Sequence, residues 1–158
     1  MKTLTVYLAG CEGWYENNIP GEDYYKRWRR ESEKYFKYYS DGIYVINPCD
    51  YYDYKEKYHK SEQEIRRFDL HKVRNCDVVL VNLDHIKDSV GTLNEIFCAD
   101  ENRIPIIGFY EFNGENKNEW ADDRYKTEPW ILDACHRIED EEDALINALT
   151  YIENYFFL

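Results

Sequence analysis

The sequence predicts a single α/β domain in which helices cover both faces of a parallel sheet. Four short segments rich in aliphatic and β-branched residues are apolar almost throughout, which is typical of strands buried on both faces. Charged segments with helical spacing separate them, and this alternation builds a three-layer sandwich through right-handed crossovers. At 158 residues and 44% hydrophobic content, the chain is long enough for one such domain, spanning 1–158, and too short for two.

The predicted strands lie in the apolar segments. They cover 4–10, 43–48, 77–83 and 104–110, and a weaker candidate lies near the sequence ACHRIE at 134–139. We therefore expect a parallel sheet of four to five strands. No internal repeat or low-complexity tract interrupts the chain.

The predicted helices lie between these strands and after the last one. Helical spacing of apolar residues marks 22–39, 61–75, 91–102 and 140–157. One face of the first helix collects Tyr25, Trp28, Ser32, Tyr35 and Tyr39, and the second directs Ile65, Phe68, Leu70 and Val73 toward a core. The arginines of the first helix could contact a phosphate of a ligand, but we expect them on the helix surface, solvated or paired with Glu31 and Glu33: Arg27, Arg29 and Arg30.

The charge balance limits the possible partners. The chain carries 20 basic and 32 acidic residues, a formal net charge of -12, and such a surface repels a phosphate backbone. We therefore expect no nucleic-acid partner, and any phosphate-bearing ligand should be small. No segment approaches the roughly 20 apolar residues of a membrane span, so we expect a cytoplasmic protein without a membrane partner.

The cysteines and histidines indicate neither a disulfide framework nor a metal. The five cysteines are widely spaced and form no C-x-x-C pair, and the four histidines show no H-x-x-x-H spacing. We expect no metal and no other cofactor. Of the histidines, His85 alone is predicted on the loop where a ligand would lie.

The functional site is predicted at one edge of the sheet, because ligands of open parallel sheets bind beyond the carboxyl ends of the strands. The predicted strands are followed by AGCEGWYENNIPG, NPCDYYDY, DHIKDSVG and EFNGEN. One edge therefore collects glycines, aromatic residues and acids. The long polar connection at 111–130 also leaves this edge, and long loops in compact domains are commonly functional.

Glu95 is the first catalytic candidate at this edge. It follows Gly91 by four residues, so we expect it in the opening turn of the third helix, where the helix dipole favours the ionised carboxylate. An ionised carboxylate at such a position is a competent nucleophile. Gly91 permits close approach of a ligand to the backbone, and the N–H groups of Val90, Gly91 and Thr92 are potential donors to ligand oxygens.

Each candidate also has a structural interpretation. In this interpretation, Ser89 or Asp88 only caps the third helix, and Glu95 is a solvated acid of its first turn. Asp69, a lone acid on a helix with many core positions, is a structural residue whose hydrogen-bonding capacity is satisfied within the fold. Tyr7, on the first strand, is then a core tyrosine.

The order and spacing of several motifs strengthen the functional interpretation. They are YLAG at 7–10, WR at 28–29, NP at 47–48, DLHKVRNCDVVLVNLD at 69–84, SVGTLNE at 89–95 and EPWILDACHRI at 128–138. Together they resemble the nucleoside 2-deoxyribosyltransferase family over nearly the whole domain. The resemblance implies a flavodoxin-like fold, cleavage of the N-glycosidic bond of nucleosides or nucleotides, and a homo-oligomer whose active sites are shared between subunits.

The resemblance also implies roles for individual residues. Glu95 matches the family's nucleophilic glutamate, Tyr7 the tyrosine that orients it, and Asp69 the aspartate that engages the base. Trp14, in the loop after the first strand, is then positioned to stack on the base, and Gly10 and Gly91 are substrate-binding positions.

One position departs from the family's pattern. Transferases of the family typically carry an aspartate six residues before the nucleophile, where it accepts a hydrogen bond from the sugar's 5′-hydroxyl, and this chain has Ser89 there. A serine can donate to a phosphate, although Asp88 is adjacent and a one-residue shift returns a carboxylate to the 5′-hydroxyl. The acidic first loop, 11–23, favours a free nucleoside.

We therefore predict transfer of the deoxyribosyl group of a 2′-deoxynucleoside to another free nucleobase, or to water, through a covalent glutamyl intermediate. One alternative is an N-glycosidase acting on 2′-deoxynucleoside 5′-monophosphates. A second, from another class, is a nucleotide-binding or sensor module without catalysis.

Overall fold

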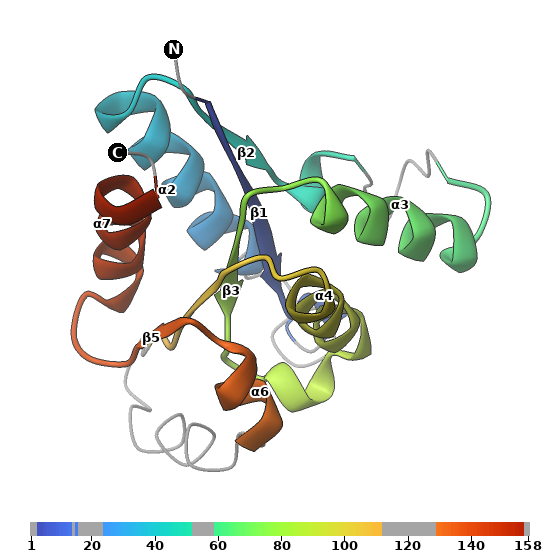
Figure 1. Cartoon of the computed structure of the whole chain (residues 1–158). Helices are drawn as coiled ribbons and strands as arrows, with labels where there is room; N and C mark the ends of the chain where they lie inside the picture. The colour runs from blue at the N-terminus through green and yellow to red at the C-terminus, as the bar shows by residue number, and fades with distance from the viewer. Residues whose placement is uncertain (1–2, 14, 16–23, 52–58, 112–128, 157–158) are drawn as a thin grey trace.

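A five-stranded parallel sheet forms the middle layer of the protein (Figure 1). The computed structural model describes residues 3–13, 15, 24–51, 59–111 and 129–156. Its strands are β1 (Leu4–Gly10), β2 (Ile43–Ile46), β3 (Val78–Asn82), β4 (Ile106–Phe109) and β5 (Arg137–Glu139). They lie in the order β2-β1-β3-β4-β5 and all pair in parallel. The four predicted strands and the weaker fifth are all confirmed.

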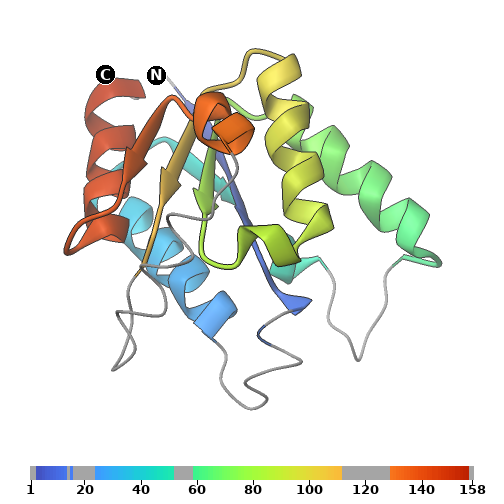
Figure 2. The same ribbon diagram turned by 90° about the horizontal axis from the view of Figure 1, so that it is seen from below.

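Helices cover both faces of this sheet, which confirms the three-layer sandwich (Figures 1 and 2). One face carries α2 (Tyr24–Tyr39) and α7 (Ala144–Phe156), and the other carries α3 (Glu62–Arg74), α4 (Val90–Glu101) and the short α6 (Pro129–Ala134). Two single-turn helices, η1 (Pro48–Asp50) and η2 (Ile86–Asp88), follow β2 and β3. Within the described residues, no helix has both the length and the apolar character needed to cross a bilayer.

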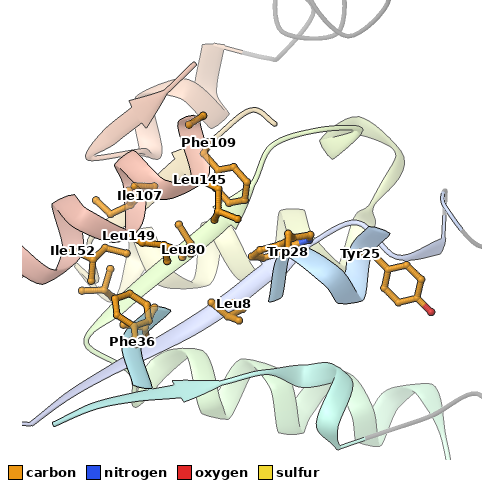
Figure 3. Packing of buried hydrophobic residues seen from close by; sticks show 14 of the residues in the cluster. Leu8, Tyr25, Trp28, Phe36, Leu80, Ile107, Phe109, Leu145, Leu149 and Ile152 are labelled. Atoms are coloured by element: carbon orange, nitrogen blue, oxygen red, sulfur yellow. The ribbon is translucent and has the colours of Figure 1, made fainter. Parts of the chain in front are cut away.

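The core is divided in two by the sheet, because successive side chains of a strand point to opposite faces. On β1, Leu4, Val6 and Leu8 pack into the half below α2 and α7, whereas Tyr7 and Ala9 pack into the half below α3 and α4. Figure 3 shows the first half, in which Leu8 and Trp28 lie among side chains from β3, β4 and α7. The same alternation directs Tyr7 toward α4, the helix that carries Glu95.

The buried face of α2 differs from the predicted one: Tyr24, Arg29 and Phe36 are buried although they were not predicted on it, and Tyr39 is not buried. Arg29, expected on the surface, is only 1% exposed, because it lies one turn after buried Tyr25 on the face that packs on the sheet. Tyr39, expected on the buried face, is 63% exposed; it ends the helix and packs against Tyr35 and Tyr38 instead.

Helix α4 begins one residue earlier than predicted. Ser89 is its N-cap, and the Ser89 hydroxyl accepts a hydrogen bond from the N–H of Thr92 at 3.3 Å. Because Val90 is the first helical residue, Glu95 lies in the second turn, and the expectation of an opening-turn position was wrong. The second turn carries Glu95 away from the helix terminus and over the sheet.

Gly10, the last residue of β1, is packed so closely that a side chain there would collide with its neighbours. A Cβ atom at Gly10 would lie 2.9 Å from Cζ2 of Trp28 and 3.3 Å from Cβ of Asn82. Both neighbours are buried and have no free space to move into. We therefore predict that Gly10→Ala lowers the free energy of unfolding by about 1–3 kcal/mol, the usual cost of overpacking a core, as measured by urea denaturation.

Gly13→Ala is the matched control, because a Cβ atom there meets nothing within 4 Å. The free energy of unfolding of this variant should stay within about 0.5 kcal/mol of the wild-type value. Equal losses in the two variants would contradict the close packing at Gly10.

Candidate active site

A cavity opens at the carboxyl edge of the sheet, where β1 and β3 lie side by side and the strand order reverses. This is the position at which open α/β sheets bind ligands. The cavity has a volume of about 540 Å³ and lies between the end of β1, α3 and the first turns of α4. It is lined by Gly10, Glu12, Gly13, His59, Glu62, Ile65, Arg66, Asp69, Leu70, Ser89, Val90, Gly91, Thr92, Asn94 and Glu95.

The carboxyl group of Glu95 is the buried acid of this cavity. Its Oε2 atom is shielded from solvent and has no hydrogen-bond partner among the described residues. Burial raises the pKa of Glu95 from 4.5 to about 8, and the nearby polar side chain of Tyr7 lowers it in part. Desolvation is the largest influence on this carboxyl group, and Glu95 lies in the second turn of α4, beyond the first turn in which a helix dipole acts most strongly. Burial in the cavity therefore favours the neutral form of Glu95 over the carboxylate.

Asp69 and Tyr7 approach Glu95 from different elements. Asp69 lies on α3, lines the cavity and raises the pKa of Glu95 through its negative charge. Tyr7 lies on β1, beneath the cavity, and its side chain is completely buried. Three residues from a strand and two helices thus meet around one carboxyl group, as the sequence motifs suggested they would.

The other predicted substrate-binding residues lie in different places. Gly10, Ser89 and Gly91 line the cavity, and a Cβ atom at Gly91 would meet nothing within 4 Å, so the start of α4 is open to a ligand. Asp88 ends η2, just before the Ser89 cap, and is not part of the lining. Trp14 lies outside the described residues.

The cavity wall is predominantly acidic. Four carboxyl side chains line it, from Glu12, Glu62, Asp69 and Glu95, against the cation of Arg66 and the imidazole of His59. The Arg66 guanidinium donates to Oδ1 of Asn94 at 3.3 Å, which links α3 to α4 across the cavity. This charge distribution favours a ligand with hydrogen-bond donors over one with several negative charges.

Sequence analysis missed three charged residues of the cavity wall, Glu12, Glu62 and Arg66, and the buried Arg29 behind it. The Nη2 atom of Arg29 donates to the carbonyl of Gly10 at 3.1 Å and lies 3.6 Å from Oε1 of Glu12. Helical spacing could have predicted the burial of Arg29, because this residue shares its helix face with Tyr25, Trp28 and Ser32. Nothing in the sequence placed Glu12 against it.

A second polar network lies beside the cavity, on the α2 side of the same edge. The Tyr24 hydroxyl donates to Glu111 at 2.7 Å and accepts from Asn82 at 3.1 Å, and the backbone N–H of Glu111 donates to Asp84 at 3.0 Å. Burial, reinforced by Asp84 and Glu111, raises the pKa of Tyr24 well above its ordinary value. Tyr24 therefore remains a neutral donor that joins α2 to the ends of β3 and β4.

His85 lies beside this second network, next to Tyr15, which packs against Tyr24, and it does not line the cavity. It has a left-handed backbone with φ of 57°, and its ring packs edge-on against Tyr15 at 5.5 Å between centroids. Within the described part of the chain, no group of three or more His, Cys, Asp or Glu side chains is arranged to hold a metal ion.

Comparisons with known proteins bear on both the sequence and the fold. The sequence matches the family model for nucleoside 2-deoxyribosyltransferase over residues 6–147. A search of curated proteins found no match.

Several solved structures share the fold. A conserved protein from Enterococcus faecalis V583 is 15% identical, with a TM-score of 0.67 over 94% of this chain and 98% of that one. A 2-deoxyribosyltransferase from Bacillus psychrosaccharolyticus is 19% identical, with a TM-score of 0.59 over 96% of this chain and 91% of that one. The corresponding enzyme from Leishmania mexicana is 16% identical, with a TM-score of 0.58 over 96% and 99%. At these identities the structural likeness establishes the fold.

The raised pKa of Glu95 predicts a specific pH dependence of stability. A pKa raised above its unfolded value stabilises the fold below pH 4.5, and this contribution is lost as pH rises toward 8. Glu95→Gln, which cannot ionise, should escape the loss. We predict that the stability of this variant relative to wild type grows between pH 5 and pH 8 by up to about 1.4 kcal/mol per pH unit, as measured by urea denaturation.

Glu101→Gln, at the exposed end of the same helix, is the matched control. Its stability relative to wild type should change little over the same range. A gap between Glu95→Gln and wild type that is independent of pH would contradict the burial of an ionisable carboxyl group.

Proposed function

The chain belongs to the nucleoside 2-deoxyribosyltransferase family of pentosyltransferases, and on that premise we propose that it cleaves the N-glycosidic bond of 2′-deoxynucleosides and transfers the deoxyribosyl group to a second free nucleobase or to water. The observation that carries this proposal is the buried carboxyl group of Glu95 with Asp69 in the same cavity. Glycosyl transfer with a covalent intermediate needs two such groups, one as nucleophile and one as acid.

Glu95 is the proposed nucleophile. In its ionised form, one carboxylate oxygen attacks the anomeric carbon while the C–N bond breaks and its electron pair leaves with the base. The transition state resembles an oxocarbenium ion, and the product is a deoxyribosyl ester of Glu95. Tyr7, which lowers the pKa of Glu95, is the residue proposed to stabilise the charged carboxylate and to orient it by a hydrogen bond in the substrate complex.

Asp69 is the proposed acid. Because two nearby carboxylates repel each other, the pair with Glu95 favours a state that holds one proton. We assign that proton to Asp69 in the substrate complex, from which it passes to the departing base. The Asp69 carboxylate then accepts a proton from the incoming base, or from water, as this second nucleophile attacks the sugar and releases Glu95.

The remaining cavity residues are proposed to bind the sugar and the base. The open start of α4, at Gly91, suits the 5′ end of the sugar, where Ser89 or the adjacent Asp88 meets the 5′-hydroxyl. Gly10 forms part of the cavity wall at the end of β1. Trp14 remains a predicted stacking partner of the base.

Hydrolysis of 2′-deoxynucleoside 5′-monophosphates is the second candidate. Ser89, the N-terminus of α4 and the guanidinium of Arg66 all line the cavity, and each can donate to a phosphate. Four carboxyl groups on the same wall oppose a dianionic ligand. The charge balance therefore favours the free nucleoside.

Assembly into a homo-oligomer with shared active sites is also proposed. Large aromatic side chains remain exposed near the C-terminal ends of α2 and α7, which lie side by side, and on α6: Tyr38, Tyr39, Tyr155 and Trp130. Exposed aromatic groups of this kind favour subunit contacts. A neighbouring subunit would also limit the access of water to a site that forms an oxocarbenium-like transition state.

The experiment that tests this function is a substrate panel. Purified protein is incubated with 2′-deoxynucleosides, their 5′-monophosphates and the matching ribonucleosides, with and without a second free base, and products are separated by chromatography. We expect base exchange on the 2′-deoxynucleosides and a loss of at least about 10³-fold in Glu95→Gln, because the amide keeps the shape and loses the nucleophile.

Glu101→Gln serves as the control here too, because it makes the same substitution on the same helix outside the cavity, and it should retain wild-type activity. Cleavage confined to the 5′-monophosphates would establish the second candidate. Binding without turnover on any member of the panel would identify a non-catalytic module, and full activity in Glu95→Gln would exclude Glu95 as the nucleophile.

A further inference from the structure

Arg29 carries a positive charge in the interior, immediately beneath the cavity. Its side chain is fully buried, with Nη1 donating to the carbonyl of Tyr25 at 2.6 Å and Nη2 donating to the carbonyl of Gly10 at 3.1 Å. The guanidinium also lies 4.6 Å from the ring centre of Trp28. Burying a cation costs several kcal/mol unless other groups compensate, so its position at the end of β1 calls for a reason.

Glu12 is the carboxylate that faces this cation. Its Oε1 atom lies 3.6 Å from Nη2 of Arg29 and accepts a hydrogen bond from the Cys49 thiol at 3.3 Å. The Glu12 side chain is 17% exposed and lines the cavity, whereas that of Arg29 is 1% exposed. The pair therefore reaches from the protein interior to the cavity wall.

The side chains that influence the ionisation of Glu95 come from four separate segments of the chain. They are Tyr7 on β1, Glu12 in the following segment, Arg29 on α2 and Asp69 on α3, and His59, Glu62 and Arg66 line the rest of the cavity. Burial raises the pKa of Glu95 most, Asp69 and Glu12 raise it further, and Tyr7 and Arg29 lower it. Arg29 is the buried cation that opposes the two acids.

We propose that Arg29 is a positioning residue for deoxyribosyl transfer: it holds the end of β1 and the Glu12 carboxylate in the wall of the cavity that contains Glu95, and its charge favours the form of Glu95 that attacks the sugar. This inference rests on the proposed function of Glu95 as nucleophile. Glu12 acts in the opposite direction, because it neutralises part of the field of Arg29.

The geometry explains why the residue is an arginine. Its forked guanidinium serves two backbone carbonyls and one carboxylate at once, and its planar face lies against Trp28. A lysine at this position would keep the charge but could not reach all of these partners in the same arrangement. Substitution by lysine should therefore restore part of the effect on Glu95.

The test is a direct titration of Glu95 that does not depend on turnover. The protein is labelled with ¹³C at the side-chain carboxyl of glutamate, and the Glu95 resonance is assigned by its absence in Glu95→Gln. We expect the midpoint to move up by about 1 pH unit in Arg29→Met and down in Glu12→Gln, with Arg29→Lys between wild type and Arg29→Met. In a plot of kcat/KM against pH, the midpoint of the fall on the acidic side should move in the same directions as the Glu95 midpoint.

Opposite shifts distinguish this role from a structural one. If Arg29 only holds the fold together, both Arg29 variants melt at lower temperature while the midpoint of Glu95 stays at the wild-type value in every variant, and that result would overturn the inference. Should Arg29→Met fail to fold, Glu12→Gln and Arg29→Lys carry the same test.

The substrate panel with wild-type protein remains an independent experiment. Unmoved midpoints in a protein that exchanges bases would overturn the role of Arg29 alone. Absence of base exchange in the wild type would instead overturn the proposed function, whatever the titration shows.

Discussion

The removal of the Glu95 carboxyl group from water is the constraint on which the rest of the site depends. A carboxylate at the carboxyl edge of the sheet is poorly solvated, so its pKa rises to about 8 and its charged form needs support from the protein. Tyr7 from β1 and Arg29 from α2 supply that support, and Asp69 and Glu12 oppose it. A poorly solvated carboxylate is also a better nucleophile, which connects the cost of its burial to the proposed chemistry.

The topology of the sheet brings these groups together. Alternation along β1 turns Tyr7 toward α4, and the end of that strand presents the Gly10 carbonyl to Arg29 from the opposite face. Because β1 and β3 are neighbours, the helices that follow them, α2 and α4, lie on opposite faces of the sheet, and the cavity opens at the end of β1, between α3 and the start of α4. The charge of Arg29, on one side of the sheet, thus acts on the carboxyl group of Glu95, on the other side.

Much of this arrangement could be predicted from the sequence. The strands are apolar segments, and the Ser89 cap is a local hydrogen bond, so both depend on neighbours in the chain. The burial of Arg29 and the raised pKa of Glu95 depend instead on contacts among segments far apart in the sequence. Helical spacing placed Arg29 beside core residues, but the usual preference of arginine for the surface concealed its position. The pairing with Glu12 required the fold itself.

The central claim is that Glu95 becomes covalently attached to the sugar, and intact-mass spectrometry tests it most directly. Protein mixed with a 2′-deoxynucleoside in the absence of an acceptor base is quenched in acid, weighed, and digested to locate any modification. The account predicts a mass increase of one deoxyribosyl group on the peptide that contains Glu95, which disappears when a second base is added before the quench. An adduct on another residue, or base exchange by a protein that never acquires an adduct under rapid quenching, would contradict it.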